Sequence, residues 1–250
     1  MKKIFKYIFA GMAAMSVVAC SEDALETSPS SSVSGNELLG TATNALVSLN
    51  GVYRAMYTAG VSNSSNTHQC FGITAYNLVA DVMGEDCIMN GQGSGWFWYD
   101  CVYNVKSRYT STGWRSYDMW NGYYTWISNV NYILAEEETM SGSETEKNYV
   151  LGQAYAVRAY SYFMLAQMFS RTYKGHESEP CVPLYTEPTD IATEGKGRAT
   201  VEEVYQQITS DLDKAITMLG NSGKRKHISH INEACLLYTS PSPRDRSVSR

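Results

Sequence analysis

Apolar side chains recur at helical spacing in four segments of the chain. In the first segment, Ser34 and Glu37 have the spacing of a capping box, in which each side chain bonds the backbone amide of the other residue. The apolar face that follows consists of Leu38, Ala42, Ala45, Leu49, Val52 and Met56. This pattern predicts a helix that begins near residue 34.

The second segment, residues 115–137, places a residue on the same helix face every three or four positions. That face consists of Trp120, Tyr124, Ile127, Asn131 and Leu134. The segment closes on three consecutive glutamates at 136–138. Because negative charge is unfavourable at the negative C-terminal end of a helix, we predict that this helix ends before them.

Capping boxes also open the third and fourth segments. Ser143 and Glu146 precede an apolar stripe that continues to about residue 169, and Thr200 and Glu203 precede one that Gly220 ends. Small side chains crowd the third segment, at Gly152, Ala154, Ala156, Ala159 and Ser161. Because small side chains let another helix approach closely, we predict that this helix is central and contacted on two sides.

The connections between these segments are long. Residues 179–200 contain three prolines and two glycines without any period, which predicts an extended connection of the kind that carries function or faces a partner. Residues 71–82 fit a helix, whereas residues 91–112 are rich in Gly, Ser, Tyr and Trp and predict a loop or a short strand. Leu151, Gly152 and Tyr155 match part of a tetratricopeptide unit. The residues alone therefore predict a mostly α fold with tetratricopeptide-like helix pairs and long decorating loops.

The N-terminal residues have the layout of a secretory signal. Lys2, Lys3 and Lys6 precede an apolar run at 8–19 that is too short to span a bilayer. The run ends Val-Val-Ala-Cys at Cys20, which resembles a bacterial lipoprotein cleavage site. We therefore expect residues 1–19 to be a lipoprotein signal peptide, Cys20 to carry the lipid, and the polar residues 20–33 to form a flexible tether. Ordinary signal cleavage after Ala19 is the alternative.

The last residues, 235–250, lose all periodicity. Their start, "CLLYTSPSPRD", resembles the translation of a sequencing adapter, so we expect a non-native tail and leave it out of functional arguments. Without both ends, residues 21–234 carry 14 Lys and Arg against 24 Asp and Glu, a net charge of about −10. Such an acidic surface repels nucleic acid, which is therefore not an expected partner.

Four cysteines remain between the two ends: Cys70, Cys87, Cys101 and Cys181. Export permits disulfides, but four thiols allow three pairings that the sequence does not rank, and buried free thiols are the alternative. No pair has the spacing of a zinc knuckle.

The segment 91–100, "GQGSGWFWYD", carries the candidate binding chemistry. Four aromatic residues follow three glycines, which let the backbone turn and leave rings unshielded. If the segment is extended, Trp96 and Trp98 share one face, and Phe97 and Tyr99 share the other. Exposed rings suit the flat C–H faces of sugars, whereas the competing interpretation places both tryptophans in the core. The predicted ligand-binding residues are Trp96, Trp98, Tyr99, Asp81, Asp100 and Asn104, in which the carboxylates and the amide bond sugar hydroxyls.

Catalytic signatures are weak. Gly91, Gly93 and Gly95 lack the spacing of a dinucleotide loop, and no Gly-x-Ser-x-Gly elbow is present. His227 and His230 are three residues apart, but they lie next to the tail at 235–250 and no acidic second shell is in view. We therefore expect no enzymatic activity, no catalytic residue, no cofactor and no metal.

The third helical segment, "LGQAYAVRAYSYFMLAQMFSRTY", closely resembles the signature helix of the SusD/RagB family of outer-membrane lipoproteins of the Bacteroidetes. Three further pieces agree with that family in order: "WNGYYTWISNVNYIL", "CVPLYTEPTD" and "GRATVEEVYQQITSDLDKAITML". With the cleavage site at Cys20, they extend the resemblance over nearly all of residues 20–234.

The resemblance implies that residues 34–234 form the N-terminal part of a truncated SusD-like helical domain. Family members capture an oligosaccharide and pass it to a TonB-dependent, SusC-like β-barrel transporter. Glu22 and Asp23, just after Cys20, are similar to the surface-export signal of these lipoproteins. The expected function is thus glycan capture at the cell surface. Peptide capture in the same kind of uptake complex, or a lipid-anchored helical scaffold without a nutrient ligand, are the alternatives.

Overall fold

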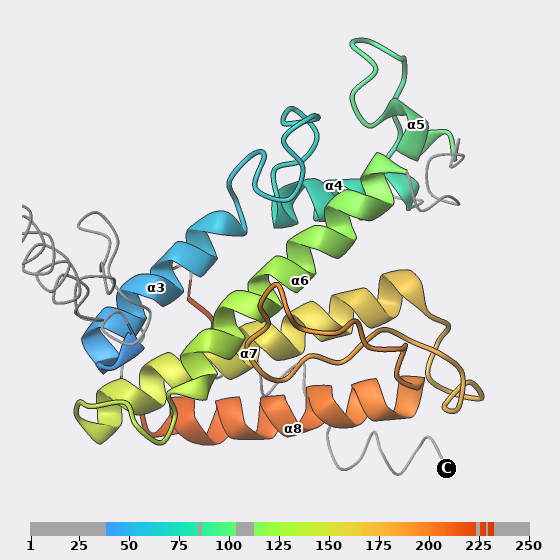
Figure 1. The fold of residues 1–250 in the computed structure, drawn as a ribbon. Helices are drawn as coiled ribbons and strands as arrows, with labels where there is room; N and C mark the ends of the chain where they lie inside the picture. The colour runs from blue at the N-terminus through green and yellow to red at the C-terminus, as the bar shows by residue number, and fades with distance from the viewer. Residues whose placement is uncertain (1–38, 85–86, 104–112, 224–225, 229, 233–250) are drawn as a thin grey trace, which may run out of the picture. The chain divides into compact units, whose positions relative to one another are not determined.

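The computed structural model describes residues 39–84, 87–103, 113–223, 226–228 and 230–232. Within these ranges the named elements are helices and no strand is present, so the predicted mostly α fold is confirmed (Figure 1). The helices are α3 (Ala42–Ala55), α4 (Ile73–Met83), α5 (Trp98–Cys101), α6 (Trp114–Ala135), α7 (Glu144–Phe169) and α8 (Val201–Gly220). None of the described helices is long and apolar enough to cross a membrane.

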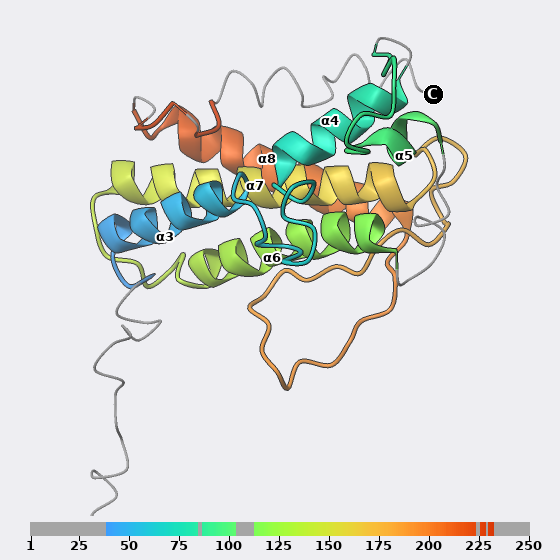
Figure 2. The same cartoon turned by 90° about the horizontal axis from the view of Figure 1, so that it is seen from above.

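Helix α7 lies at the centre of the helical core. It packs against α8 and α6 and also contacts α3 (Figures 1 and 2). Its small residues permit this approach, because a Cβ added at Gly152 would lie 2.9 Å from Cγ of Leu219 on α8. The prediction of a central helix contacted on two sides is confirmed.

Both capping boxes predicted for the long helices are present. The Ser143 hydroxyl accepts a hydrogen bond from the Glu146 amide at the start of α7, and Thr200 and Glu203 make the same arrangement at α8. Helix α6 ends at Ala135, before the acidic run at 136–138, as predicted. Helix α4 likewise agrees with the helical interpretation of residues 71–82.

The first predicted helix is interrupted at Thr41. Thr41 is extended (φ −128°, ψ 144°) and its side chain accepts a hydrogen bond from the amide of Asn44, so this residue caps α3. Leu39 before it is helical, so the predicted helix is interrupted at residues 40–41, and its predicted start at Ser34 and Glu37 lies outside the described residues. The predicted apolar face is buried from Ala42 to Met56.

The four described cysteines are free thiols. Cys70 and Cys181 are buried, Cys101 is half-buried and Cys87 is exposed. The buried-thiol alternative is thus the one observed for two of them. Cys20, the tether at 20–33 and the tail at 235–250 lie outside the described residues.

Candidate functional site

Aromatic side chains gather near solvent in two described regions that we compare, the aromatic loop and a pocket beside α6. The first is the aromatic loop, residues 95–99. Trp96 and Tyr99 are 50% and 56% exposed, whereas Phe97 is 6% exposed and Trp98 is half-buried. Phe97 adopts a left-handed conformation (φ 56°) and caps the short helix α5. The segment is therefore not extended: a turn of helix follows Phe97, and the exposed rings are those of Trp96 and Tyr99.

Phe97 anchors the aromatic loop to the core. Its backbone amide donates a hydrogen bond to Oε1 of Gln69, with a length of 2.9 Å. Its ring packs edge-on against Phe71, with ring centroids 6.1 Å apart, and the guanidinium of Arg115 lies 5.1 Å from its ring centroid. On the outer side, the ring of His68 lies 5.3 Å from that of Trp96.

Arg115 connects the aromatic loop to helix α6. Its side chain is 1% exposed; Nη1 donates to the backbone carbonyl of Gln69 at 2.8 Å, and Nη2 lies 3.2 Å from Oδ2 of Asp100. Asp118, on the next turn of α6, lies farther away, with 4.0 Å between its Oδ2 and Nη1. Burial lowers the pKa of Arg115 and raises that of Asp118, because desolvation disfavours both charged forms.

The predicted polar site residues occupy different environments. Asp81 is exposed near the end of α4, which packs against α5. Asp100 is 6% exposed and pairs with Arg115, so its carboxylate holds the loop in place. Asn104 lies outside the described residues.

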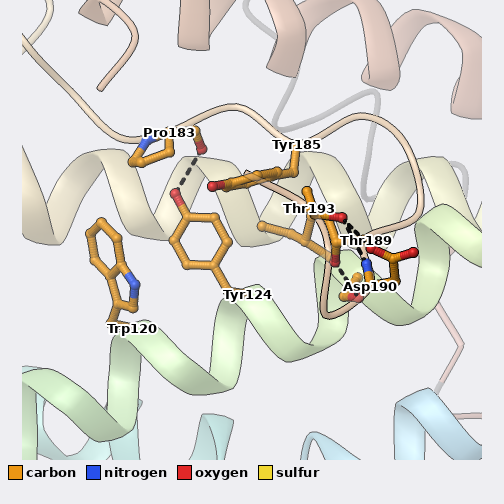
Figure 3. A pocket seen from close by; sticks show the side chains of 9 residues that line it. Trp120, Tyr124, Pro183, Tyr185, Thr189, Asp190 and Thr193 are labelled. Atoms are coloured by element: carbon orange, nitrogen blue, oxygen red, sulfur yellow. Dashed lines mark hydrogen bonds between the residues drawn. The ribbon is translucent and has the colours of Figure 1, made fainter. Parts of the chain in front are cut away.

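The second region is the α6 pocket, a cavity of about 320 Å³ between α6 and the connection that follows α7 (Figure 3). Sequence reasoning did not identify it. The residues that line it are Trp120, Tyr124, Ile127, Ser128, Pro183, Tyr185, Thr189, Asp190 and Thr193.

One end of the α6 pocket is aromatic. The rings of Trp120 and Tyr124, one helical turn apart, have centroids 4.9 Å apart, and the ring of Tyr185 stands at 84° to that of Tyr124. The Tyr124 hydroxyl donates to the backbone carbonyl of Pro183 at 2.7 Å, which ties the helix to the connection (Figure 3). Burial raises the pKa of Tyr124, so this hydroxyl stays protonated and remains a donor.

The other end of the α6 pocket is polar. Oγ of Ser128 lies 3.3 Å from Oγ1 of Thr189. The Asp190 carboxylate accepts hydrogen bonds from the Thr193 hydroxyl at 3.0 Å and from the Ala192 amide at 2.9 Å. These bonds, the Thr193 hydroxyl first, hold the pKa of Asp190 below its ordinary value, so the group is charged at neutral pH.

A buried polar network fixes the connection that forms the outer wall of the pocket. Nε and Nη2 of Arg158 on α7 each bond an oxygen of Asp211 on α8 at 2.7 Å. Nη1 of Arg158 donates to the Thr186 carbonyl at 3.1 Å, and Asn131 on α6 donates to the Tyr185 carbonyl at 2.8 Å. Burial opposes the charge of Arg158, but the bonds and charge of Asp211 raise its pKa above the usual value. Helices α6 and α7 thus hold residues 185–187, and α8 orients Arg158 through Asp211.

Two sequence signals pointed toward this network. Asn131 occupies a position in the apolar stripe of α6, and Arg158 stands among alanines in α7. A polar residue at a buried helical position requires partners, because burying it unpaired is costly. The partner elements, however, are distant in the sequence.

A third concave region lies beside α3, with a volume of about 480 Å³ and His227 and His230 in its lining. His230 is buried, with Nδ1 2.7 Å from the Tyr149 hydroxyl and Nε2 2.8 Å from Oδ1 of Asn50. Both ring nitrogens are therefore engaged. Across the described ranges, no three His, Cys, Asp or Glu side chains gather as a metal site would require.

Three solved structures share this architecture. A SusD-like carbohydrate binding protein from Bacteroides vulgatus is 27% identical, with a TM-score of 0.67 over 79% of this chain and 40% of its own. A SusD superfamily protein from Bacteroides fragilis is 24% identical, with a TM-score of 0.61 over 80% of this chain and 44% of its own. One from Bacteroides thetaiotaomicron is 22% identical, with a TM-score of 0.55 over 78% and 40%.

The chain thus spans less than half the length of these structures. No curated protein matches it. A SusD-like family model, described as starch-binding and associating with the outer membrane, matches residues 89–236. This match includes α5 to α8 and covers more than half of the chain, and the helical fold agrees with it. The chain therefore belongs to the SusD-like family.

Proposed function

We propose that the chain is part of an outer-membrane lipoprotein that captures an oligosaccharide and passes it to a TonB-dependent, SusC-like β-barrel transporter. The observation that carries this proposal is the match to a family described as starch-binding and associating with the outer membrane. The first solved structure above is likewise named a carbohydrate binding protein. The protein binds its ligand and does not transform it.

The aromatic loop is the proposed site of glycan capture. Its exposed rings, Trp96 and Tyr99, offer flat apolar faces to the C–H faces of a sugar, and Trp98 is half-exposed beside them. Asp81 and Asn104 are the proposed partners of sugar hydroxyls. Asp100, also predicted as a ligand, supports the site through Arg115.

Membrane attachment completes the proposal. Residues 1–19 direct export, the lipid on Cys20 anchors the protein, and residues 20–33 let the helical body stand away from the outer membrane at the cell surface. Metabolic labelling with a fatty acid should mark the wild-type chain and not Cys20→Ser. Labelling of both proteins, or of neither, would contradict the anchor.

The binding test compares the exposed aromatic pair of the loop with one exposed tyrosine elsewhere. Trp96→Ala with Tyr99→Ala should weaken binding of a maltooligosaccharide at least about tenfold, or about 1.4 kcal/mol, in isothermal titration calorimetry. The control is Tyr117→Ala on α6, since Tyr117 is also about half exposed, at 52%, and lies outside the aromatic loop. It should leave the affinity unchanged.

Equal affinities of the loop variant and the wild-type chain would reject the aromatic loop as the site. Binding of peptides in place of every glycan tested would favour peptide capture. If neither glycans nor peptides bind and the chain captures a membrane protein, the lipid-anchored helical scaffold would be favoured.

A further inference from the structure

The α6 pocket is not used by the proposed capture at the aromatic loop. We propose that it is a second, separate binding site that takes one pyranose ring of a sugar. The site is made of α6 and residues 183–193, and none of its lining residues belongs to the aromatic loop. Sugar binding in this pocket is therefore independent of glycan capture at the aromatic loop.

The aromatic end of the pocket suits the apolar faces of a sugar ring. Trp120 and Tyr124 lie one helical turn apart on the same face of α6, with ring centroids 4.9 Å apart. The Tyr185 ring stands nearly perpendicular to Tyr124, at 84°, so the rings form a corner and not a flat stack (Figure 3). A pyranose ring presents C–H groups on its faces and hydroxyls around its edge, which fits a corner of rings that opens onto polar groups.

The polar end supplies the groups that sugar hydroxyls require. Ser128, Thr189 and Thr193 contribute hydroxyls, and each hydroxyl has one donor and two acceptor positions. The bond between Ser128 and Thr189 therefore leaves further capacity on both residues. Asp190 adds a charged acceptor that already has a fixed orientation, because the Thr193 hydroxyl and the Ala192 amide both bond it. Figure 3 shows Thr189, Asp190 and Thr193 together at the end of the pocket away from Trp120.

The size and rigidity of the pocket narrow the ligand further. A volume of about 320 Å³ is at the lower end of the range for small-ligand sites, which fits a single ring and not a folded oligosaccharide. The outer wall is fixed before any ligand binds: Asn131 bonds the Tyr185 carbonyl, Arg158 bonds the Thr186 carbonyl, and the Tyr132 hydroxyl bonds the Thr189 carbonyl at 2.8 Å. A preformed wall reduces the ordering cost of binding.

The test uses the Ile127 side chain as a local probe, because Ile127 lines the pocket and is buried. In the whole chain labelled at isoleucine methyl groups, maltotriose should shift the Ile127 methyl resonance in a saturable manner at about 10 mM sugar. Loss of this resonance in Ile127→Val assigns it. The same shift should persist in the variant that lacks Trp96 and Tyr99, which separates this site from the aromatic loop.

Ser128→Trp fills the pocket from the helix and should weaken the response of Ile127 at least tenfold. Asn129→Trp is the matched control, since Asn129 is the next residue of α6, is exposed and does not line the pocket. Thr193→Phe fills the pocket from the opposite wall and repeats the test should Ser128→Trp fail to fold.

Three outcomes would overturn the proposal. The first is an Ile127 response that is unchanged in both filling variants. The second is no response to maltotriose, cellotriose or xylotriose at about 10 mM. The third is a response to a tripeptide in place of the sugars. If the aromatic loop proves not to bind glycans, these readouts are unaffected, because none of them depends on Trp96 or Tyr99.

Discussion

The aromatic loop and the α6 pocket reach a similar chemistry by different means. In the α6 pocket, Trp120 and Tyr124 come from one long helix, so the backbone itself sets the distance between their rings. In the aromatic loop, Trp96 precedes the left-handed residue Phe97 and Tyr99 lies in the single helical turn after it, so the positions of both rings depend on what holds Phe97. Rings on a helix are placed by local geometry, whereas rings on a loop are placed by distant contacts.

Each region depends on a buried arginine, and the two arginines differ in how well they are paired. Arg158 makes two bonds of 2.7 Å to Asp211, and its pKa is raised despite burial. Arg115 lies 3.2 Å from Asp100 and 4.0 Å from Asp118, and burial lowers its pKa. The geometry of the α6 pocket is therefore more tightly fixed than that of the aromatic loop.

The largest expected effect on stability comes from breaking the ion pair between Arg158 and Asp211. Arg158→Met leaves the Asp211 carboxylate buried without its cation and should lower the free energy of unfolding by about 3–5 kcal/mol in chemical denaturation. Arg158→Met with Asp211→Leu should be less destabilised, since no unpaired charge remains.

Arg171→Ala is the surface control for this change. Arg171 is 69% exposed and lies 3.5 Å from Glu179, so its loss should cost less than about 0.5 kcal/mol. Equal losses for Arg158→Met and Arg171→Ala would show that the buried network does not hold the fold.

Arg115→Met should disturb the aromatic loop and leave the α6 pocket unchanged. The free energy of unfolding should fall by about 2–3 kcal/mol, less than for Arg158→Met, because the ion pair between Arg115 and Asp100 is longer. Hydrogen exchange should accelerate at the Phe97 amide, which bonds Gln69, and glycan binding at the aromatic loop should weaken. The response of Ile127 in the α6 pocket should not change. A uniform acceleration of exchange over both regions would contradict a local role for Arg115.

The sequence predicted those parts of the fold that depend on local chemistry. The boxes at Ser143 and Thr200 mark the starts of α7 and α8 correctly, because both bonding partners lie within four residues. The predicted first helix was not expected to be interrupted, but Thr41 starts α3 with a cap of its own. Apolar periodicity thus predicts the helical face but does not show a cap that lies within the pattern.

The sites were harder to predict, because their geometry comes from contacts across long stretches of chain. The turn at Phe97 depends on Gln69 and Arg115, neither of which is near it in the sequence. The α6 pocket requires residues around Tyr185 to return to α6, and the bond from Tyr124 to Pro183 spans 59 positions. The sequence marked the aromatic loop as a candidate site but not which of its rings reach solvent, and it placed Trp120 and Tyr124 on a helix face without indicating a pocket.

Substitutions at two helical glycines test how tightly the helices behind the α6 pocket pack against each other. Gly152→Ala brings a Cβ to 2.9 Å from Leu219 Cγ and should cost about 1–3 kcal/mol in thermal or chemical unfolding, through strain between α7 and α8. Gly51→Ala on α3 meets nothing within 4 Å and should stabilise the fold by about 0.5–1 kcal/mol, because alanine favours a helix. Similar effects of the two changes would argue against tight packing at Gly152.

The smallest expected effects are opposite in sign for the two regions and depend on pH. Burial raises the pKa of Asp118, beneath the aromatic loop, so the folded chain holds this proton more tightly than the unfolded chain does. The stability that this group contributes is therefore present at low pH and is lost as the pH rises through its folded pKa. In the α6 pocket, the Thr193 hydroxyl and then the Ala192 amide lower the pKa of Asp190. Its contribution is present above the unfolded pKa and is lost as the pH falls through the folded value.

Unfolding measured from about pH 3 to about pH 7 for Asp118→Asn and Asp190→Asn separates these contributions. Relative to the wild-type chain, Asp118→Asn should gain stability as the pH rises, because the wild type bears the cost of a buried charge there. Asp190→Asn should lose stability over the same rise, by a small amount, since Asp190 is exposed. Slopes of the same sign would mean that Arg115 compensates the Asp118 charge fully despite the 4.0 Å separation.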